Sequence, residues 1–596
     1  MDPRPVVLVA LVGLTLCTGG AMLQATSPPT FSGDEVSAST VSPTPLETEP
    51  TCPRAVTEPI EGNDTGSNTT PTEPRIVELY PNPTIRDNVG EYLVLEVPAE
   101  TTLGNWTLTD GHTTATFPNE TVSGRVALSL EPTVTAELTD DPVYELEGHV
   151  RLAADGDELE LRNETTTVDT VAYDRAPLAE RWYRSDSDGD AAVETPAEGT
   201  WHPRGGTCLP VSTADVDAAT AFVLPDGPET PREAIHEADE RLLVAGYTIT
   251  SETIADDLVA AADRGVDVRV LVESGPVGGT PAATEDVLET LTAGDVEVRA
   301  IGGEGARYRY HHPKYAVADD RVIVTTENWK PAGVGGEGSR GWGVVLEDET
   351  LAGDLAAVFA ADYGGWDTDS GTAFLSDATF VEDDGDVAPS RSYPTEHEPE
   401  TVPVETAELL VAPDNAETQL TELLAGADEE ILVKQASIDA DAAVLEETIE
   451  AARRGVDVTI LLDSTWYHED ENAALASDLE ELAAAESLSL EVALVEETDR
   501  FEKIHAKGVV VDREVAVVGS ANWNANAFEN NREVLLALHG EAVANYYATV
   551  FEDDWTGDGR WTLPFGVSVT VIVVLALAAL VGRRYVRFGE SGSRDE

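Results

Sequence analysis

The chain has 596 residues, of which 113 are acidic and 36 basic, so its formal net charge is −77. Five of the basic residues are lysines: Lys314, Lys330, Lys434, Lys503 and Lys507. An acidic surface with few lysines stays hydrated in concentrated salt, which predicts a source of the haloarchaeal type. Molar salt screens charges within about 3 Å, so this charge excludes neither nucleic acid nor lipid as a partner, and most carboxylates serve solvation.

Both ends of the chain predict export and membrane anchoring. Residues 1–25 contain an apolar run followed by small residues, the pattern of a signal peptide. Residues 26–72 are rich in Thr, Pro and Glu and predict a disordered stalk. The twenty uncharged residues 563–582 predict a transmembrane helix, and the arginines of 583–596 place that tail in the cytoplasm. We therefore expect a single-pass protein of the cell membrane with the bulk of the chain, including its folded domains, outside the cell.

Cysteines and glycosylation sequons fit an exported chain. Cys17 lies in the signal peptide, and Cys52 and Cys208 could form a disulfide; the alternative is two unrelated thiols. Asn-X-Ser/Thr sequons are confined to the first third of the chain and predict N-glycosylation there. They begin at Asn63, Asn68, Asn105, Asn119 and Asn163.

Residues 73–205 predict an all-β sandwich. Short segments of alternating hydrophobicity are separated by turn residues, as in RIVELYPNP and GDELELRN. This region resembles the lamin-tail domain, an immunoglobulin-like fold. The resemblance is carried by the ELYPNP opening, by Gly90-Glu91-Tyr92 and by Asn105-Trp106. It implies a binding or spacing module and no chemistry.

An internal repeat occupies most of the remaining chain. AFVLPDGPETPREAIHEADERLLVAGYTI (221–249) is matched by ELLVAPDNAETQLTELLAGADEEILVKQASI (408–438). Each unit predicts a strand, an amphipathic helix and a buried strand, and the repeat is too long for a solenoid. We expect a duplicated α/β domain with copies at 215–377 and 406–556, joined by an acidic linker at 378–405.

Each copy contains the sequence His-X-Lys at the same place. With 10 histidines and five lysines in the chain, chance predicts about 0.08 such pairs. A following strand supplies two neutral polar residues in each copy, and residues two apart on a strand share a face. We expect the two patches to face each other across a pseudo-twofold axis and to form one pocket. The patches are His312, Lys314, Thr326 and Asn328 in the first copy and His505, Lys507, Ser520 and Asn522 in the second.

This set of side chains suits cleavage of a phosphodiester. One neutral histidine can attack phosphorus to form a phosphohistidine, while the other, protonated, donates to the departing alkoxide. The lysines and amides stabilise charge on the phosphate oxygens, so this chemistry requires no metal or other cofactor. A carboxylate, for which Glu533 is the candidate, can orient the imidazoles.

The second copy resembles the phospholipase D superfamily, whose signature is His-X-Lys-X4-Asp followed by Gly-Ser-X-Asn. Every position of that signature is present: His505, Lys507, Asp512, Gly519, Ser520 and Asn522, with Glu533 beyond. The resemblance implies a metal-independent enzyme in which two such motifs form one active site over about residues 221–555, with Asp512 among the catalytic residues.

The first copy departs from this signature. It keeps His312, Lys314, Asp319 and Asn328, but Thr325-Thr326 replace Gly-Ser, and Gly341 stands where the second copy has Glu533. We expect these departures to affect the orientation of His312.

Several substrates remain open. The readings are a phospholipid phosphodiesterase or transphosphatidylase, an extracellular nuclease, a cardiolipin-synthase-like transferase, and a non-catalytic surface protein with a degenerate first motif. About eight residues separate the second α/β domain from the membrane segment, a tether of at most about 28 Å. The pocket would then lie near the cytoplasmic membrane, which favours a phospholipid, although a lamin-tail module would serve a nuclease equally well.

Overall fold

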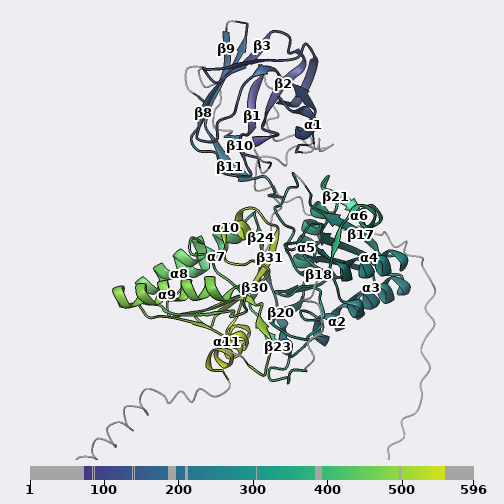
Figure 1. Ribbon diagram of the computed structural model, residues 1–596, viewed down its shortest axis with the longest axis vertical. Coiled ribbons are helices and arrows are strands. Elements are labelled where there is room, and N and C mark those ends of the chain that lie inside the picture. Colours follow the sequence, from purple (N-terminus) through teal and green to yellow (C-terminus); the bar gives the residue numbers. More distant parts are fainter. Residues whose placement is uncertain are drawn as a thin grey trace, which may run out of the picture. The chain divides into compact units, whose positions relative to one another are not determined.

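The computed structural model describes residues 73–83, 85, 88–136, 138–139, 141–164, 166–185, 196–207, 213–303, 305–382, 392–495 and 498–557 (Figure 1). The predicted signal peptide, stalk, transmembrane segment and tail lie outside these residues, as do Cys52, Cys208, Asn63 and Asn68. Within the described ranges, no helix has both the length and the apolar character needed to cross a membrane.

The N-terminal region consists of two β-sheets. The first has the order β11-β10-β1-β2-β5-β6, and the second has the order β7-β4-β3-β8-β9. Their bounds are β1 Arg75–Tyr80, β2 Tyr92–Thr102, β3 Trp106–Thr109, β4 Thr114–Thr116, β5 Thr121–Ser129, β6 Val143–Glu145, β7 Glu147–His149, β8 Asp157–Asn163, β9 Thr166–Tyr173, β10 Glu180–Arg184 and β11 Gly199–Pro203, with the short helix α1 at Pro132–Thr135.

Alternating apolar side chains join the two sheets. Leu93 and Leu95 of β2 share one buried core with Leu108 of β3 and with Leu159 and Leu161 of β8. Residues i and i+2 of a strand face the same side of the sheet, so these side chains pack together between the two sheets. The region is therefore β-rich as predicted, and the sequon residues Asn105, Asn119 and Asn163 are all exposed.

The first α/β half forms a ten-stranded sheet with the order β21-β17-β15-β14-β18-β19-β20-β13-β23, with β28 pairing off this path with β20. Its elements are β13 Ala218–Leu224, α2 Glu229–His236, β14 Arg241–Gly246, α3 Glu252–Arg264, β15 Asp267–Glu273, β16 Thr280–Pro281, α4 Ala282–Ala293, β17 Glu297–Ile301, β18 Tyr315–Ala318, β19 Arg321–Thr325, β20 Ser339–Glu347, α5 Glu349–Tyr363, β21 Thr368–Ser370, α6 Gly371–Asp377, β22 Phe380–Val381 and β23 Glu400–Pro403.

The second half repeats this plan in an eight-stranded sheet with the order β12-β24-β31-β30-β29-β25-β26-β27. Its elements are β24 Thr406–Ala412, α7 Ala416–Ala425, β25 Glu430–Gln435, α8 Ala443–Arg454, β26 Asp457–Leu462, α9 Glu469–Glu486, β27 Leu490–Leu494, β28 Lys503–Ile504, β29 Lys507–Val511, β30 Val515–Gly519, α10 Ala525–Glu529, β31 Glu533–His539 and α11 Glu541–Thr556; β12, Thr213–Asp215, comes from before the first half. The predicted duplication is confirmed.

The repeated Arg-Gly sequence explains equivalent helix ends. Helices α3 and α8 each end at a glycine, Gly265 and Gly455, with φ of 99° and 105°. This left-handed conformation is open to glycine because it lacks a Cβ atom. The chain can then turn at once into the buried strands β15 and β26.

A shared core joins the two halves. Helices α2, α3 and α4 cover one face of the first sheet, and α7, α8 and α9 cover one face of the second (Figure 1). Between the sheets, one core contains Val223 and Trp342 of the first half, Leu409 and Leu536 of the second, and apolar residues of α5 and α11. Because the halves bury their remaining apolar faces against each other, the ends of their central strands are fixed relative to one another.

The segment expected to be a linker, 378–405, contains a strand of the first half. Residues Ala218 to Ala221 of β13 pair with β23 in antiparallel register, and Ala219 lies opposite Val402. The acidic composition of the segment gave no sequence signal for this strand, which forms one edge of the first sheet. On the other side, β12 pairs with β24 and so belongs to the second sheet.

Candidate active site

Each His-X-Lys segment pairs with a strand of the opposite half. The backbone amide of His312 donates to the carbonyl oxygen of Arg532 at 3.0 Å, and that of His505 donates to the carbonyl oxygen of Arg340 at 3.0 Å. Strand β28, just before His505, runs parallel to the start of β20. Both motifs therefore meet along the interface between the halves, as the pseudo-twofold hypothesis requires.

His312 of the first half is held by a carboxylate of the second half. Its Nδ1 atom lies 2.8 Å from Oε1 and 2.9 Å from Oε2 of Glu533. Asn531 donates from its side chain to Oε1 of Glu533 at 3.1 Å, which fixes the carboxylate in turn. Because Nδ1 is engaged, Nε2 is the nitrogen of His312 that is left for a substrate.

His505 has a matching partner that the sequence analysis did not identify. Oε2 of Glu327 lies 3.2 Å from Nδ1 of His505, and the side chain of Glu327 is 3% exposed. Glu327 belongs to the first half and follows β19. Each histidine thus has a carboxylate of the opposite half next to Nδ1. The contact of His312 is a hydrogen bond, whereas that of His505 is a close approach without hydrogen-bond geometry among the described residues.

Glu327 fills the space that a side chain at Gly341 would occupy. A Cβ atom added to Gly341 would lie 2.2 Å from Cγ and 2.7 Å from Oε1 of Glu327. The carboxylate missing at Gly341 is therefore supplied from the neighbouring strand. The glycine at position 341 therefore changes which residue stands beside His505. The expectation that it would affect the orientation of His312 is corrected. The sequence signal for Glu327 is its place between Thr326 and Asn328, two predicted site residues. It is difficult to recognise because the chain has 113 acidic residues.

The two motif lysines are buried beside the histidines. Nζ of Lys314 donates to the carbonyl oxygen of His312 at 2.5 Å, and Nζ of Lys507 donates to that of His505 at 2.8 Å. Both lysines are at most 1% exposed. Burial lowers the pKa of each lysine from its usual value, although the nearby carboxylates Glu327 and Glu533 oppose the shift. Two ammonium groups in a desolvated site attract an anion strongly.

Both imidazoles are neutral at pH 7 in the free protein. Burial lowers the pKa of His312 to about 4, against the opposing effect of Glu533. Burial together with Lys507 and Lys503 holds the pKa of His505 well below its usual value. An anionic phosphodiester would offset the lysine charges and raise the pKa of an adjacent imidazole, so binding itself can protonate one of the two.

The carboxylates respond differently to their surroundings. Burial alone would raise the pKa of Glu533, but His312 and Lys314 outweigh it, and the pKa lies below its usual value. For Glu327, burial dominates over the nearby lysines and the pKa is raised. Glu533 therefore stays ionised beside His312 over a wider pH range than Glu327 does beside His505.

The aspartates of the two motifs lie at the opposite ends of the strands. Asp512 accepts the backbone amides of residues 428, 429 and 430 at 2.7 to 2.9 Å. Asp319 accepts those of residues 239, 240 and 241 at 2.8 to 2.9 Å. Strand β29 separates Asp512 from Lys507 by about 16 Å at the usual rise of a strand. The structure therefore gives Asp512 a role in holding a turn, and the catalytic role expected for it is corrected.

The predicted substrate-binding side chains divide into two kinds. Oγ1 of Thr326 accepts the amide of Trp342, and Oγ of Ser520 accepts the amide of Val534, each at 3.0 Å. These hydroxyls thus tie neighbouring strands together next to the histidines. Oδ1 of Asn328 is buried and has no partner among the described residues, and Asn522 is half-buried. The amide of Asn328 is therefore the better candidate for contact with a substrate.

Two reciprocal ion-pair clusters hold the strands that carry Gly341 and Glu533. Arg532 bonds to Asp414 of its own half and to Asp362 of the first half, each at 2.9 Å. Arg340 donates a hydrogen bond to Asp226 of its own half at 2.7 Å and forms an ion pair with Asp554 of the second half at 3.0 Å. Charges buried this deeply must be paired, so the clusters fix the register of the two halves at the site.

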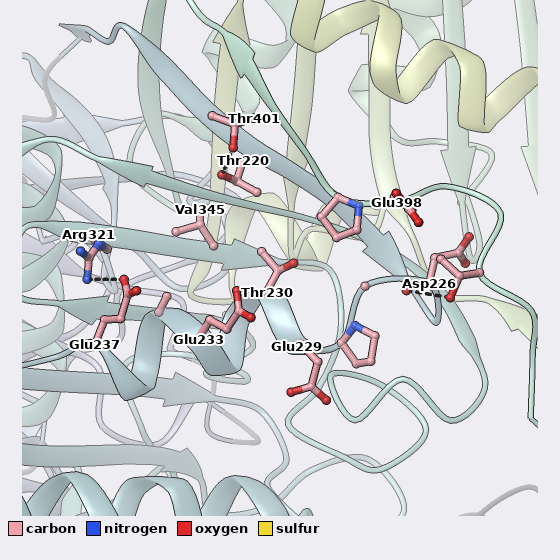
Figure 2. A pocket seen from close by; sticks show the side chains of 15 residues that line it. Thr220, Asp226, Glu229, Thr230, Glu233, Glu237, Arg321, Val345, Glu398 and Thr401 are labelled. Carbon is pink, nitrogen blue, oxygen red and sulfur yellow. Dashed lines mark hydrogen bonds and ion pairs between the residues drawn. The ribbon is translucent and has the colours of Figure 1, made fainter. Parts of the chain in front are cut away.

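A separate pocket of about 650 Å³ lies along α2 and is lined by none of the motif residues (Figure 2). Glu229, Glu233 and Glu237 of α2 line it together with Glu398, and Arg321 is paired with Glu237 at 3.2 Å. Asp226 also lines the pocket, and five carboxylates would repel a phosphodiester. The site of the chemistry is therefore the interface between the motifs.

Comparison with known proteins finds relatives of both α/β halves. Residues 232–363 and 420–555 match the family model described as "Cardiolipin synthase, PLD-like domain". The chain is 33% identical over 134 residues to cardiolipin synthase A of Pseudomonas fluorescens, a match covering 22% of this chain and 26% of the relative. It is 36% identical over 52 residues to a mitochondrial cardiolipin hydrolase of Canis lupus familiaris, covering 9% and 20%.

A solved structure, that of phosphatidylserine synthase from Haemophilus influenzae, resembles 63% of this chain and 96% of its own, with a TM-score of 0.44 and 14% identity. The chain spans about a quarter of the length of the curated relatives it matches.

Proposed function

We propose that the two halves, which are phospholipase D-like domains, form a single active site that cleaves the phosphodiester of a phospholipid through a phosphohistidine. The observation that carries this proposal is the crossed pairing of His312 with Glu533 and of His505 with Glu327. Each half supplies the carboxylate that orients the other half's imidazole, so neither half is complete alone.

The chemistry follows from these pairs. Nε2 of one neutral histidine attacks phosphorus, and the bond from phosphorus to the leaving oxygen breaks. The other histidine, protonated on Nε2 when the anionic substrate binds, gives its proton to that oxygen. Water or an alcohol then attacks the phosphohistidine, its proton returns to the second histidine, and the first imidazole is released. Lys314 and Lys507 stabilise the negative charge on the phosphoryl oxygens throughout.

A phospholipid is the favoured substrate. The matching family model and curated relatives are named for cardiolipin synthesis and hydrolysis. These names cover both transfer of a phosphatidyl group to an alcohol and its transfer to water, and the mechanism above permits either acceptor. Hydrolysis and transfer are therefore two outcomes of one phosphohistidine.

The site is proposed to face the outside of the cell. This rests on the signal-like residues 1–25 and on the uncharged residues 563–582 with arginines after them. A short tether would hold the site beside the outer leaflet of the cytoplasmic membrane. The lamin-tail-like character of residues 73–205, their N-glycosylation, and adaptation to concentrated salt are proposed on the same sequence grounds.

The test is an assay of the full chain, purified in detergent and high salt, with a chelator present. Phosphatidylglycerol, phosphatidylcholine, and single- and double-stranded DNA are offered separately, with and without added glycerol. We expect headgroup release, and a new phosphatidyl ester when glycerol is present, both lost in His505→Asn. Cleavage of DNA with no turnover of either lipid would overturn the proposal in favour of a nuclease.

A further inference from the structure

Exposed apolar side chains gather next to the motifs. The described residues include five large hydrophobic side chains that are strongly exposed: Leu178, Val277, Trp366, Trp466 and Tyr467. Three of them, Val277 at 74%, Trp466 at 85% and Tyr467 at 44%, lie in only two loops, 274–279 and 463–468. These loops follow the equivalent strands β15 and β26. Such a concentration in a chain of net charge −77 indicates a contact surface.

A carboxylate that is bound to a motif segment stands just before the first loop and at the start of the second. Oε2 of Glu273 accepts the backbone amide of His311 at 2.7 Å, next to His312. Oδ1 of Asp463 accepts the backbone amide of Ile504 at 2.9 Å, next to His505. The loops are thus attached at equivalent places, one beside each histidine.

The first loop reaches His312 through an aromatic ring. The backbone amide of Val277 donates to the hydroxyl of Tyr247 at 2.5 Å. The ring of Tyr247 packs edge-on against the imidazole of His312, with 4.5 Å between ring centroids. Only the side chain of Tyr247 therefore separates Val277 from the imidazole of His312, and the side chain of Val277 is exposed to solvent.

The second loop reaches the other motif through a lysine. Nζ of Lys503 donates to the hydroxyl of Tyr467 at 3.3 Å, and Lys503 lies two residues before His505. Trp466 packs edge-on against Tyr467, with ring centroids 5.5 Å apart. The exposed indole therefore lies near the second motif, as Val277 lies near the first.

We propose that Val277, Trp466 and Tyr467, named here the apolar rim, enter the surface of a lipid aggregate and contact the lipids around the substrate, while the phosphate of the substrate lies between the histidines. This deepens the proposed function and rests on it. Trp and Tyr favour the boundary between hydrocarbon and water, because each ring has an apolar body and a polar edge. Concentrated salt strengthens such burial.

The composition of the two loops favours a lipid over a nucleic-acid strand. A strand crossing the site would place further phosphates over the loops, which requires cationic side chains there. The loops have the sequences SGPVGG and DSTWYH and contain no Lys or Arg. A phospholipid has one phosphodiester beside a glycerol with its apolar chains, which matches lysines in the site and apolar residues at its border.

The experiment compares monomeric and aggregated substrate. The full chain and the variant Val277→Ser/Trp466→Ser are assayed on dibutyroyl phosphatidylglycerol below its critical micelle concentration and on dioleoyl phosphatidylglycerol in mixed micelles. We expect kcat/KM of the variant to fall by at least about tenfold on micelles and by at most about twofold on the monomer. Leu178→Ser removes another strongly exposed apolar side chain, 51% exposed, from the β-sandwich and serves as the control.

A second measurement does not depend on turnover. Vesicles containing brominated phosphatidylglycerol quench indole emission on contact, and the fraction quenched in the full chain should exceed that in Trp466→Phe. Equal losses of kcat/KM on monomeric and micellar lipid, or equal quenching in the full chain and in Trp466→Phe, would overturn the proposal that the apolar rim enters the lipid surface. A selective loss on single-stranded DNA would show that Trp466 stacks on bases. If the unmodified chain turns over neither lipid, the proposed function itself fails, which is a separate result.

Discussion

Glu327 and Gly341 occupy one volume at the end of β19 and β20: the carboxylate of the first residue lies where a side chain of the second would project. From that position Glu327 reaches His505 of the opposite half at 3.2 Å. In the pseudo-symmetric pair of His312 and Glu533, the carboxylate is that of Glu533, which occupies the position equivalent to Gly341. The chain thus keeps two carboxylate-imidazole pairs while placing the two carboxylates on different strands.

Replacing Glu327 with Gln should remove the charge that orients and supports His505 while preserving shape. We expect kcat to fall about 100-fold or more, with little change in thermal stability, since loss of an orienting carboxylate typically costs that much. Steady-state kinetics over a range of pH measures the effect. Glu347→Gln, at the exposed end of the neighbouring strand β20, is the matched control.

The position of Glu327 can also be tested by moving the carboxylate. Gly341→Ala alone should lower activity, because its Cβ would lie 2.2 Å from Cγ of Glu327. Glu327→Ala combined with Gly341→Glu should recover most of the activity that Glu327→Ala loses. Failure of this double variant to exceed Glu327→Ala, with both folded, would contradict the shared-volume interpretation.

His312→Asn and His505→Asn should each abolish turnover, and the double variant should be no worse than either. Residues that act as one unit are strongly non-additive, and general acid–base steps contribute about 100- to 10,000-fold. Rapid quenching with phosphate-labelled lipid measures the covalent intermediate. We expect label on the protein in only one of the two single variants, which identifies the attacking histidine. Independent, additive losses would contradict a shared site.

Acid should destabilise the fold through His312. Its pKa of about 4 in the folded chain lies below the usual value near 6.5, so the unfolded chain binds a proton first and stability falls as the pH drops from 6.5 to 4. The shift corresponds to about 3 kcal/mol. Denaturant unfolding at pH 7.5, 6 and 5 measures the slope, which should be shallower in His312→Asn. An unchanged slope would show that other groups cause the acid sensitivity.

Asp512→Ala should affect stability and spare the chemistry. Three backbone amides lose their acceptor, and each unsatisfied donor costs about 1 to 3 kcal/mol where water cannot replace the bond. We expect a lower unfolding midpoint, with kcat per folded molecule within about twofold of the original. Asp319→Ala provides the equivalent change in the first half. A large loss of kcat at unchanged stability would restore the catalytic role that the motif suggested.

The sequence by itself determined the repeat, the β-rich first region and the two His-X-Lys motifs. Apolar periodicity and turn residues act over a few positions, so strands such as β14 and β25 and the Arg-Gly helix ends at Gly265 and Gly455 could be predicted from local pattern. The matched places of His312 and His505 in the two copies predicted a common pocket, because duplicated halves bury equivalent faces.

Only the tertiary structure decided which carboxylate serves which histidine. His312 and Glu533 are 221 positions apart, and their contact depends on how two sheets pack through the core shared by α5 and α11. That packing places the carboxylate partner of each histidine in the opposite half. It also brings Glu327 into the space beside Gly341, and it leaves Asp512 at a turn far from the histidines. A motif specifies which residue types are present, whereas the distances between them arise from the burial of apolar surface that brings the halves together.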